Sequence, residues 1–261
     1  MFLGIDIGSS SSKVVAVDEN KKMLGYVVKN IGTGTNGVEL CMGELMEKLH
    51  ITWEDVDYSI VTGYGRFTYD RADKQITEIT CHAKGVVSIY PNARSIIDIG
   101  GQDAKAIQLK EDGTIENFVM NEKCAAGTGR FFEVMARVLN CKIDKLAELA
   151  DSAEESVVIS STCTVFAESE VISQLASGAS LASVAKGAHI AVAKRVCGLA
   201  KRITLRPELV MTGGVALNDA MVKCMEEQLG MRVVTPENPQ IMGALGAAMF
   251  AMEKCMKKQC K

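Results

Sequence analysis

The sequence predicts an α/β protein made of two similar halves, each with a mixed sheet of parallel and antiparallel strands. The main observation is a strand that ends in Asp, an apolar residue and Gly. It occurs twice, as Gly4-Ile-Asp-Ile-Gly8 and as Ile97-Asp-Ile-Gly-Gly101. Each copy is followed by two further strand-like runs joined by a short polar turn, and then by helical runs. Strands joined by short turns run antiparallel, so an all-parallel sheet is excluded.

Length and charge narrow the class of protein. The chain has 261 residues, is 48% hydrophobic and carries a net charge of −3 without a basic block. We therefore expect one large or two half-size domains, and no nucleic-acid partner. No apolar run is long enough to cross a bilayer, and the first residues lack the basic and apolar regions of a signal peptide. We expect a cytoplasmic protein with no membrane partner.

The elements of the first half follow from apolar runs and from helical spacing. The run Phe2–Ile7 is apolar and ends at a Gly-Ser turn, which is typical of a buried strand. Val38, Met42, Leu45 and Leu49 recur at helical spacing. The predicted strands are residues 2–7, 13–18, 23–29 and 58–62, and the predicted helices are 36–49 and 74–89.

The second half restarts the same order and adds helices. Its strands are predicted at 95–99, 104–110, 115–120, 208–211 and 232–235, with a shorter strand-like run at 157–159. Its helices are predicted at 127–140, 143–150, 164–176, 181–203 and 218–229, and a last helix at 241–258 returns to the first half. We expect the first half to comprise residues 1–94 and 241–261, and the second half to comprise 95–240.

Three glycine-rich loops that leave strand ends predict a nucleotide site held between the halves. Glycines let the backbone approach phosphate closely, and nests of N–H groups bind anions. The predicted nucleotide-binding residues are Ser10, Ser12, Lys13, Gly101, Gln102, Gly213 and Gly214. Any one of these loops alone would favour a plain turn, but two matched loops and a third favour a nucleotide.

Acidic residues beside these loops predict Mg²⁺, because a cation must separate carboxylates from a polyphosphate. The predicted ligands are Asp6, Asp98 and Asp103. We place Asp98 and Gln102 in the catalytic group, with the neutral Gln102 orienting a water molecule without acting as a base. The alternative is that the acids only cap turns.

Two of the nine cysteines stand apart from the rest. Cys124 and Cys163 each come just before a predicted helix, where free N–H groups and the helix dipole favour a thiolate. The other seven fall on helices or helix ends, where a free cysteine is usually a small core residue. Two thiols are half of a tetrahedral site, which a two-fold dimer would complete. Zinc and an iron–sulfur cluster both fit, and the nearby nucleotide loops favour the cluster. None of the three histidines is placed in the sequence so that it could share a metal ion with another ligand.

The layout resembles the acetate and sugar kinase, heat-shock-70 and actin superfamily, which implies two ribonuclease-H-like halves in an actin-like ATPase fold. A more specific resemblance covers residues 3–248. The segments that carry it are Asn121–Phe131, Ser160–Ser173, Asp98–Asp103, Thr62–Arg66 and Met211–Ala216. They are similar to those of the ATP-dependent activators of 2-hydroxyacyl-CoA dehydratases. The related ATPase subunits of benzoyl-CoA reductases share the pattern in part.

The resemblance implies an ATPase that passes one low-potential electron to a separate dehydratase. It implies a homodimer with one [4Fe–4S] cluster held by Cys124 and Cys163 of each subunit, ATP or ADP with Mg²⁺, and ferredoxin or flavodoxin as electron donor. The alternatives are a small-molecule kinase of the same fold, a benzoyl-CoA reductase-type ATPase subunit and a non-catalytic actin-like protein. The loop Gly63–Arg66 is either a plain turn or a contact with phosphate or the partner enzyme.

Overall fold

The structure is a computed structural model that describes residues 1–160 and 163–259. The chain divides into two compact units. The first consists of Met1–Ala93, Leu109–Glu116 and Pro236–Lys261, and the second of Arg94–Gln108 and Asn117–Thr235. Within the described residues, no helix combines the length and the apolar character needed to cross a membrane.

The first unit contains a five-stranded mixed sheet in the order β3-β2-β1-β4-β5. Its strands are β1 (Phe2–Ile7), β2 (Ser12–Val17), β3 (Met23–Lys29), β4 (Tyr58–Thr62) and β5 (Lys74–Gln75). Strand β1 runs antiparallel to β2 and parallel to β4. The register sets Asp6 opposite both Lys13 and Thr62. The end of β1 is therefore where three chain segments bring polar side chains together.

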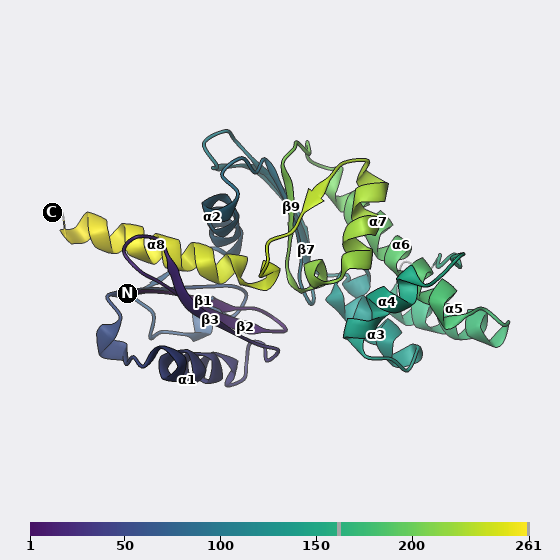
Figure 1. Cartoon of the computed structure of the whole chain (residues 1–261), viewed down its shortest axis with the longest axis horizontal. Helices are drawn as coiled ribbons and strands as arrows, with labels where there is room; N and C mark the ends of the chain where they lie inside the picture. Colours follow the sequence, from purple (N-terminus) through teal and green to yellow (C-terminus); the bar gives the residue numbers. More distant parts are fainter. Residues whose placement is uncertain (161–162, 260–261) are drawn as a thin grey trace. The chain divides into compact units, whose positions relative to one another are not determined.

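Helices cover both faces of this sheet. Helix α1 (Gly37–Leu49) packs against the face that carries Leu3 and Ile5, and α8 (Met242–Gln259) lies on the opposite side (Figure 1). Helix α8 also packs against α2 (Glu78–Ile89). A Cβ atom on Gly4 would collide with the backbone of Ala244, so the absence of a side chain there lets α8 lie directly on β1.

The second unit repeats the same sheet, in the order β10-β9-β6-β7-β8. Its strands are β6 (Ser95–Ile99), β7 (Ala104–Leu109), β8 (Ile115–Asn121), β9 (Leu209–Thr212) and β10 (Val233–Val234). Strand β6 runs antiparallel to β7 and parallel to β9, which sets Asp98 opposite Lys105 and Thr212. The repeat predicted from the Asp-x-Gly motif is thus a repeat of strand pairing and register.

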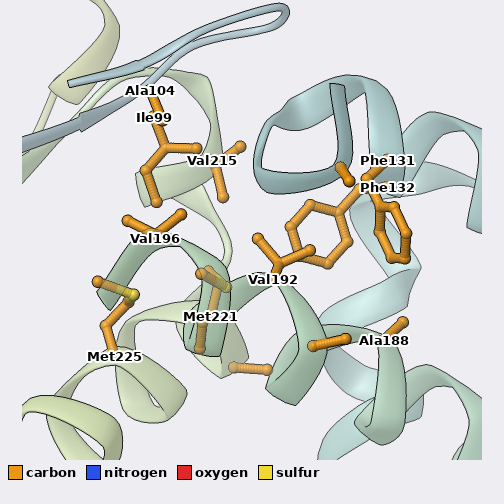
Figure 2. Packing of buried hydrophobic residues seen from close by; sticks show 14 of the residues in the cluster. Ile99, Ala104, Phe131, Phe132, Ala188, Val192, Val196, Val215, Met221 and Met225 are labelled. Carbon is orange, nitrogen blue, oxygen red and sulfur yellow. The ribbon is translucent and has the colours of Figure 1, made fainter. Parts of the chain in front are cut away.

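The helices of the second unit form a larger layer. They are α3 (Gly129–Val138), α4 (Leu146–Asp151), α5 (Thr164–Ala176), α6 (Leu181–Ala200) and α7 (Asp219–Leu229). Their shared core joins Phe131 and Phe132 of α3 to Val192 of α6 and Met221 of α7, as Figure 2 shows. This core fixes α3, α5 and α6, which carry or support the two cysteine segments.

Several predicted elements differ in the structure. The helix predicted at 74–89 is wrong at its start, because residues 74–75 pair with β4 and Thr77 is extended before α2 begins. The helix predicted at 127–140 begins only at Gly129, after a 3₁₀ turn, Ala125–Gly127, and an extended Thr128. The run 157–159 forms no strand. The helix predicted at 164–176 is confirmed as α5.

The remaining corrections concern ends of helices. The first residues of the helix predicted at 143–150 form a 3₁₀ turn, Ile143–Lys145, that leads into α4. The helix predicted at 181–203 ends at Ala200 as α6. Fraying into a tighter turn is common at helix ends, where backbone groups lack partners four residues away.

Candidate functional site

In the first unit, a buried carboxylate closes the end of β1. The Asp6 side chain is 3% exposed, and its Oδ2 accepts from Lys13 Nζ at 3.2 Å. Its Oδ1 is buried and has no hydrogen-bond partner among the described residues. The turn that follows is closed by the Gly8 N–H, which donates to the Ser11 carbonyl. Ser10 is half-buried, whereas Ser12 is buried and donates its hydroxyl to the Ile31 carbonyl.

The loop Gly63–Arg66 belongs to this same group. Gly63 follows β4 with φ +89°, and a Cβ there would collide with Asp6 Oδ1 and the Ile7 carbonyl. The Gly65 N–H donates to the Ile7 carbonyl at 2.8 Å. The sequence alone does not decide the role of this loop. The sequence feature that connects it with the site is the pair Thr62-Gly63 at a strand end, which matches Thr212-Gly213.

In the second unit, the equivalent carboxylate lies in a denser network. Lys105 is 1% exposed, and its Nζ lies 3.2 Å from Asp98 Oδ2 and 2.6 Å from Asp103 Oδ2. The Thr212 hydroxyl donates to Asp98 Oδ1 at 2.8 Å. Gly213 has φ +87°, and a Cβ there would collide with the Ile99 carbonyl. The predicted pair Asp98 and Asp103 is thus brought together, on a shared lysine.

The other predicted phosphate-loop residues remain accessible. Gln102 and Gly214 are exposed and Gly101 is half-buried. Within the part of the chain that the structure describes, no three His, Cys, Asp or Glu side chains are grouped as metal ligands. The unpartnered Asp6 Oδ1 still suits a cation or its bound water, because a buried carboxylate oxygen needs a partner.

The two predicted cluster cysteines differ from the others in exposure. Cys124 and Cys163 are exposed, while Cys41, Cys81, Cys141, Cys197, Cys224 and Cys255 are buried or half-buried, and Cys260 lies outside the described residues. Burial raises the pKa of the Cys41 thiol to about 11 and that of Cys81 to about 12. Within the described residues, two thiols are thus presented for chemistry, and they are the two that the sequence singled out.

Local hydrogen bonds hold both cysteine backbones. Cys163 is the N-cap residue of α5, as predicted, and its carbonyl accepts from Ala167 N–H. Cys124 precedes a 3₁₀ turn instead of an α-helix. The Asn121 side chain makes two hydrogen bonds with the backbone of Cys124. Its Oδ1 accepts from the Cys124 N–H at 3.2 Å, and its Nδ2 donates to the Cys124 carbonyl at 2.8 Å. Exposed thiols on fixed backbones suit metal ligation better than an inert role.

Two backbone hydrogen bonds join the segment after Cys124 to the Gly100–Gly101 turn. The N–H of Gly129 donates to the Gly100 carbonyl at 2.9 Å, and that of Arg130 donates to the Gly101 carbonyl at 2.8 Å. The first two amides of α3 are therefore satisfied by the loop next to Asp98. The sequence holds no local signal for this link, because its two ends are separated by 28 residues and meet only through the fold.

Known proteins with similar sequences cover nearly the whole chain. Residues 3–251 match the BadF/BadG/BcrA/BcrD ATPase family. The chain is 53% identical, over 98% of its length and 99% of the relative's, to the activator of lactoyl-CoA dehydratase of Anaerotignum propionicum. It is 48% identical, over 98% of both chains, to the (R)-2-hydroxyglutaryl-CoA dehydratase activating ATPase of Acidaminococcus fermentans.

A solved structure supports the same relationship. The activator of the 2-hydroxyisocaproyl-CoA dehydratase from Clostridium difficile, with bound ADPNP, matches with a TM-score of 0.97 at 45% identity. The match covers 100% of this chain and 97% of that one. The predicted fold class, two ribonuclease-H-like halves with mixed sheets in an actin-like ATPase fold, is confirmed.

Proposed function

The chain belongs to the BadF/BadG/BcrA/BcrD ATPase family, and on this premise we propose that it is the ATP-hydrolysing activator of a 2-hydroxyacyl-CoA dehydratase. The observation that carries the proposal is the pair of exposed thiols, Cys124 and Cys163, in a unit whose phosphate loop is hydrogen-bonded to the Cys124 segment. A small-molecule kinase of the same fold has no use for such a pair.

For the nucleotide, each unit contributes a loop with its carboxylate. We assign ATP and Mg²⁺ to Asp6, Asp98 and Asp103 and to the backbone of the neighbouring turns, with Ser10, Ser12 and Lys13 in the first unit and Gly101 and Gln102 in the second. Gly213 and Gly214 border the nucleoside. The buried, unpartnered Asp6 Oδ1 supports the metal assignment. Exposed Gln102 is available to orient a water molecule beside Asp98.

For the cluster, Cys124 and Cys163 are the ligands that one chain offers. When bound, a [4Fe–4S] cluster accepts and donates single electrons at low potential. Four thiolates require two chains, so the proposal includes a homodimer. The exposed face of α5, the helix that Cys163 caps, supports self-association, because its residues carry no charge: Val165, Phe166, Ser169, Ile172 and Ser173. A second copy would cover this apolar surface beside the ligand.

The hydrogen bonds from α3 to the phosphate loop give the nucleotide a route to the cysteines. ATP and ADP differ in the γ-phosphate, so they make different contacts with the Gly100–Gly101 turn. Any movement of this turn moves the Gly129 and Arg130 amides and, with them, the segment that holds Cys124. The electron enters from ferredoxin or flavodoxin and leaves to the dehydratase partner.

The test is spectroscopic and uses matched cysteine variants. The wild-type chain, purified without oxygen, should be brown and hold about four iron atoms per dimer. Cys124→Ala and Cys163→Ala should lose the colour, while the control Cys141→Ala should keep it, because Cys141 is only half-buried and lies outside both segments. A colourless wild-type protein that phosphorylates a small molecule would contradict the proposal in favour of the kinase.

A further inference from the structure

We propose that Arg195 and Glu170 form a cysteine brace, a pair of positioning side chains that holds the Cys124 turn and the Cys163 loop in a fixed relation. All the residues involved lie in the second unit. The consequence for a cluster rests on the function proposed above, whereas the brace itself is a property of the protein without any metal. Neither residue was singled out by its sequence pattern.

Arg195 supports the Cys124 side of the brace. It lies on α6, is half-buried and donates from Nη1 to the Ala126 carbonyl at 3.2 Å. Its guanidinium carbon lies 5.5 Å from the centre of the Phe131 ring, in the first turn of α3. One side chain therefore contacts both the turn after Cys124 and the helix that follows it. An arginine can do this because its planar group both donates and stacks on rings.

Glu170 supports the Cys163 side. It lies near the middle of α5 and accepts three hydrogen bonds from Ser160, three residues before Cys163. The Ser160 N–H donates to Oε1 at 2.9 Å and to Oε2 at 3.1 Å, and the hydroxyl donates to Oε1 at 2.8 Å. The chain that enters Cys163 is thereby tied back to the helix that leaves it. Hydrogen bonds to a charged carboxylate are among the stronger ones in proteins.

Electrostatics joins the two sides. Burial lowers the pKa of Arg195, and the nearby Cys124 and Glu170 side chains oppose that shift. Arg195 is therefore within electrostatic reach of both groups. Helix α5, which carries Glu170, packs against α6, which carries Arg195, so a carboxylate and a partly buried guanidinium lie on neighbouring helices. Each half of the brace thus depends on the other, which sets the relation between the two cysteine segments before any metal binds.

The brace also predicts a charge effect on a bound cluster. Residues that support metal ligands typically change metal affinity about 10- to 100-fold when they are removed. Arg195 places a positive charge near Cys124, which favours the more negative, reduced state of a cluster. Glu170 has the opposite charge. The two substitutions should therefore shift the reduction potential in opposite directions, which general structural damage would not do.

The first test needs no cluster. Hydrogen exchange is measured by mass spectrometry on the full, metal-free chain for wild type, Arg195→Gln, Glu170→Gln and the control Lys194→Gln, which removes an exposed charge from the same helix. Arg195→Gln should speed hydrogen exchange around Ser160 as well as around Cys124. Glu170→Gln should likewise speed exchange around Cys124 as well as around Ser160. If each variant loosens only its own segment, or if Lys194→Gln has the same effect, the brace is wrong.

The second test uses the cluster-loaded dimer. Iron release to a chelator should be about tenfold faster in Arg195→Gln and Glu170→Gln than in Lys194→Gln. The midpoint potential should fall in Arg195→Gln and rise in Glu170→Gln, and Arg195→Lys, which keeps the charge, should stay near wild type. Equal potentials in all variants would overturn the charge effect. A wild-type chain that takes up no cluster would sink the proposed function, and the exchange experiment would still decide on the brace.

Discussion

The two units repeat one strand arrangement around the turns that follow β1 and β6, but the aspartate at each turn has different partners. Asp6 and Asp98 end equivalent strands and face lysines at the same register, Lys13 and Lys105. In the second unit, Asp98 also accepts from the hydroxyl of Thr212 and shares its lysine with Asp103. In the first unit, Asp6 Oδ1 accepts no hydrogen bond from any described residue.

This difference arises in the turns, because the strands are alike. Gly8 N–H donates to the Ser11 carbonyl and Gly100 N–H to that of Asp103, so the two turns have the same shape. The residue at the equivalent position is therefore a serine in one unit and an aspartate in the other. A buried carboxylate oxygen without a hydrogen-bond partner is costly. In the first unit Asp6 is balanced by one lysine only, whereas in the second unit Asp98 belongs to a network with Lys105, Asp103 and Thr212.

The largest expected effect is on stability, from removing the two lysines. Lys105→Met should cost about 3–5 kcal/mol of unfolding free energy, because two neighbouring carboxylates lose their shared buried counter-charge. Lys13→Met should cost less, on the order of 2 kcal/mol, because one carboxylate is affected and the Lys13 side chain is 13% exposed. Urea unfolding of the ligand-free chain measures both.

Two controls make the comparison specific to each unit. The single tryptophan, Trp53, lies in the first unit, so its fluorescence should report the loss in Lys13→Met, while circular dichroism reports both units. Adding Asp103→Asn to Lys105→Met should recover part of the loss, since it removes one of the repelling carboxylates. If Lys13→Met and Lys105→Met lose the same amount of unfolding free energy, the charge networks of the two units are equivalent.

A smaller loss is expected from the paired glycines after β4 and β9. Gly63→Ala and Gly213→Ala should each cost about 1–3 kcal/mol, because φ near +90° strains any other residue and the new methyl group meets a backbone carbonyl. The matched controls are Gly43→Ala in α1 and Gly198→Ala in α6, which are exposed and have open space at Cβ. The controls should gain about 0.5–1 kcal/mol of unfolding free energy, as alanine does in a helix.

Thermal or urea unfolding of the four variants tests whether both units use this turn in the same way. If Gly213→Ala lowers the unfolding free energy and Gly63→Ala does not, the loop after β4 is a turn that accepts a side chain at residue 63. It would then be no counterpart of the loop after β9, which would favour the plain-turn interpretation of Gly63–Arg66.

Local patterns were enough to predict the repeated strands and the exposed cysteines. The Asp-x-Gly motif fixes where β1 and β6 end, and short turns force the antiparallel register that pairs Asp6 with Lys13. Cys163 was placed correctly because it directly precedes an apolar period that continues through α5. These features depend on residues close together in the sequence.

Contacts between distant segments could not be predicted in this way. The sequence predicts helix at β5, because the two residues of this strand carry no strand pattern. Next to them, Asp73 accepts hydrogen bonds from the Ser59 N–H and hydroxyl, a contact between distant segments. The bond from Gly129 to Gly100 and the contact of Arg195 with Ala126 depend on how α3 and α6 pack. Neither is visible as a motif, since each needs the assembled core.

The smallest expected effect concerns pH and the helical layer of the second unit. His189 is fully buried in α6, where Nδ1 donates to the Ala185 carbonyl and Nε2 accepts from Asn218 Nδ2 at 2.9 Å. Asn218 Oδ1 in turn accepts from Met221 N–H at the start of α7. This set of bonds suits a neutral imidazole with its proton on Nδ1, because a second ring proton would face the amide donor.

Burial lowers the pKa of His189, although the hydrogen bond from Nδ1 to the Ala185 carbonyl opposes that shift. The unfolded chain therefore takes up the proton first as pH falls. The stabilising contribution is complete above the unfolded pKa, about 6.5, and declines below it by at most about 1.4 kcal/mol per pH unit. His189→Gln should flatten the dependence of unfolding free energy on pH between about 5 and 6.5, even if it lowers stability throughout. Parallel curves for wild type and variant would show that His189 takes up its proton at the same pH in the folded and unfolded states, and that the contact between α6 and α7 does not depend on pH.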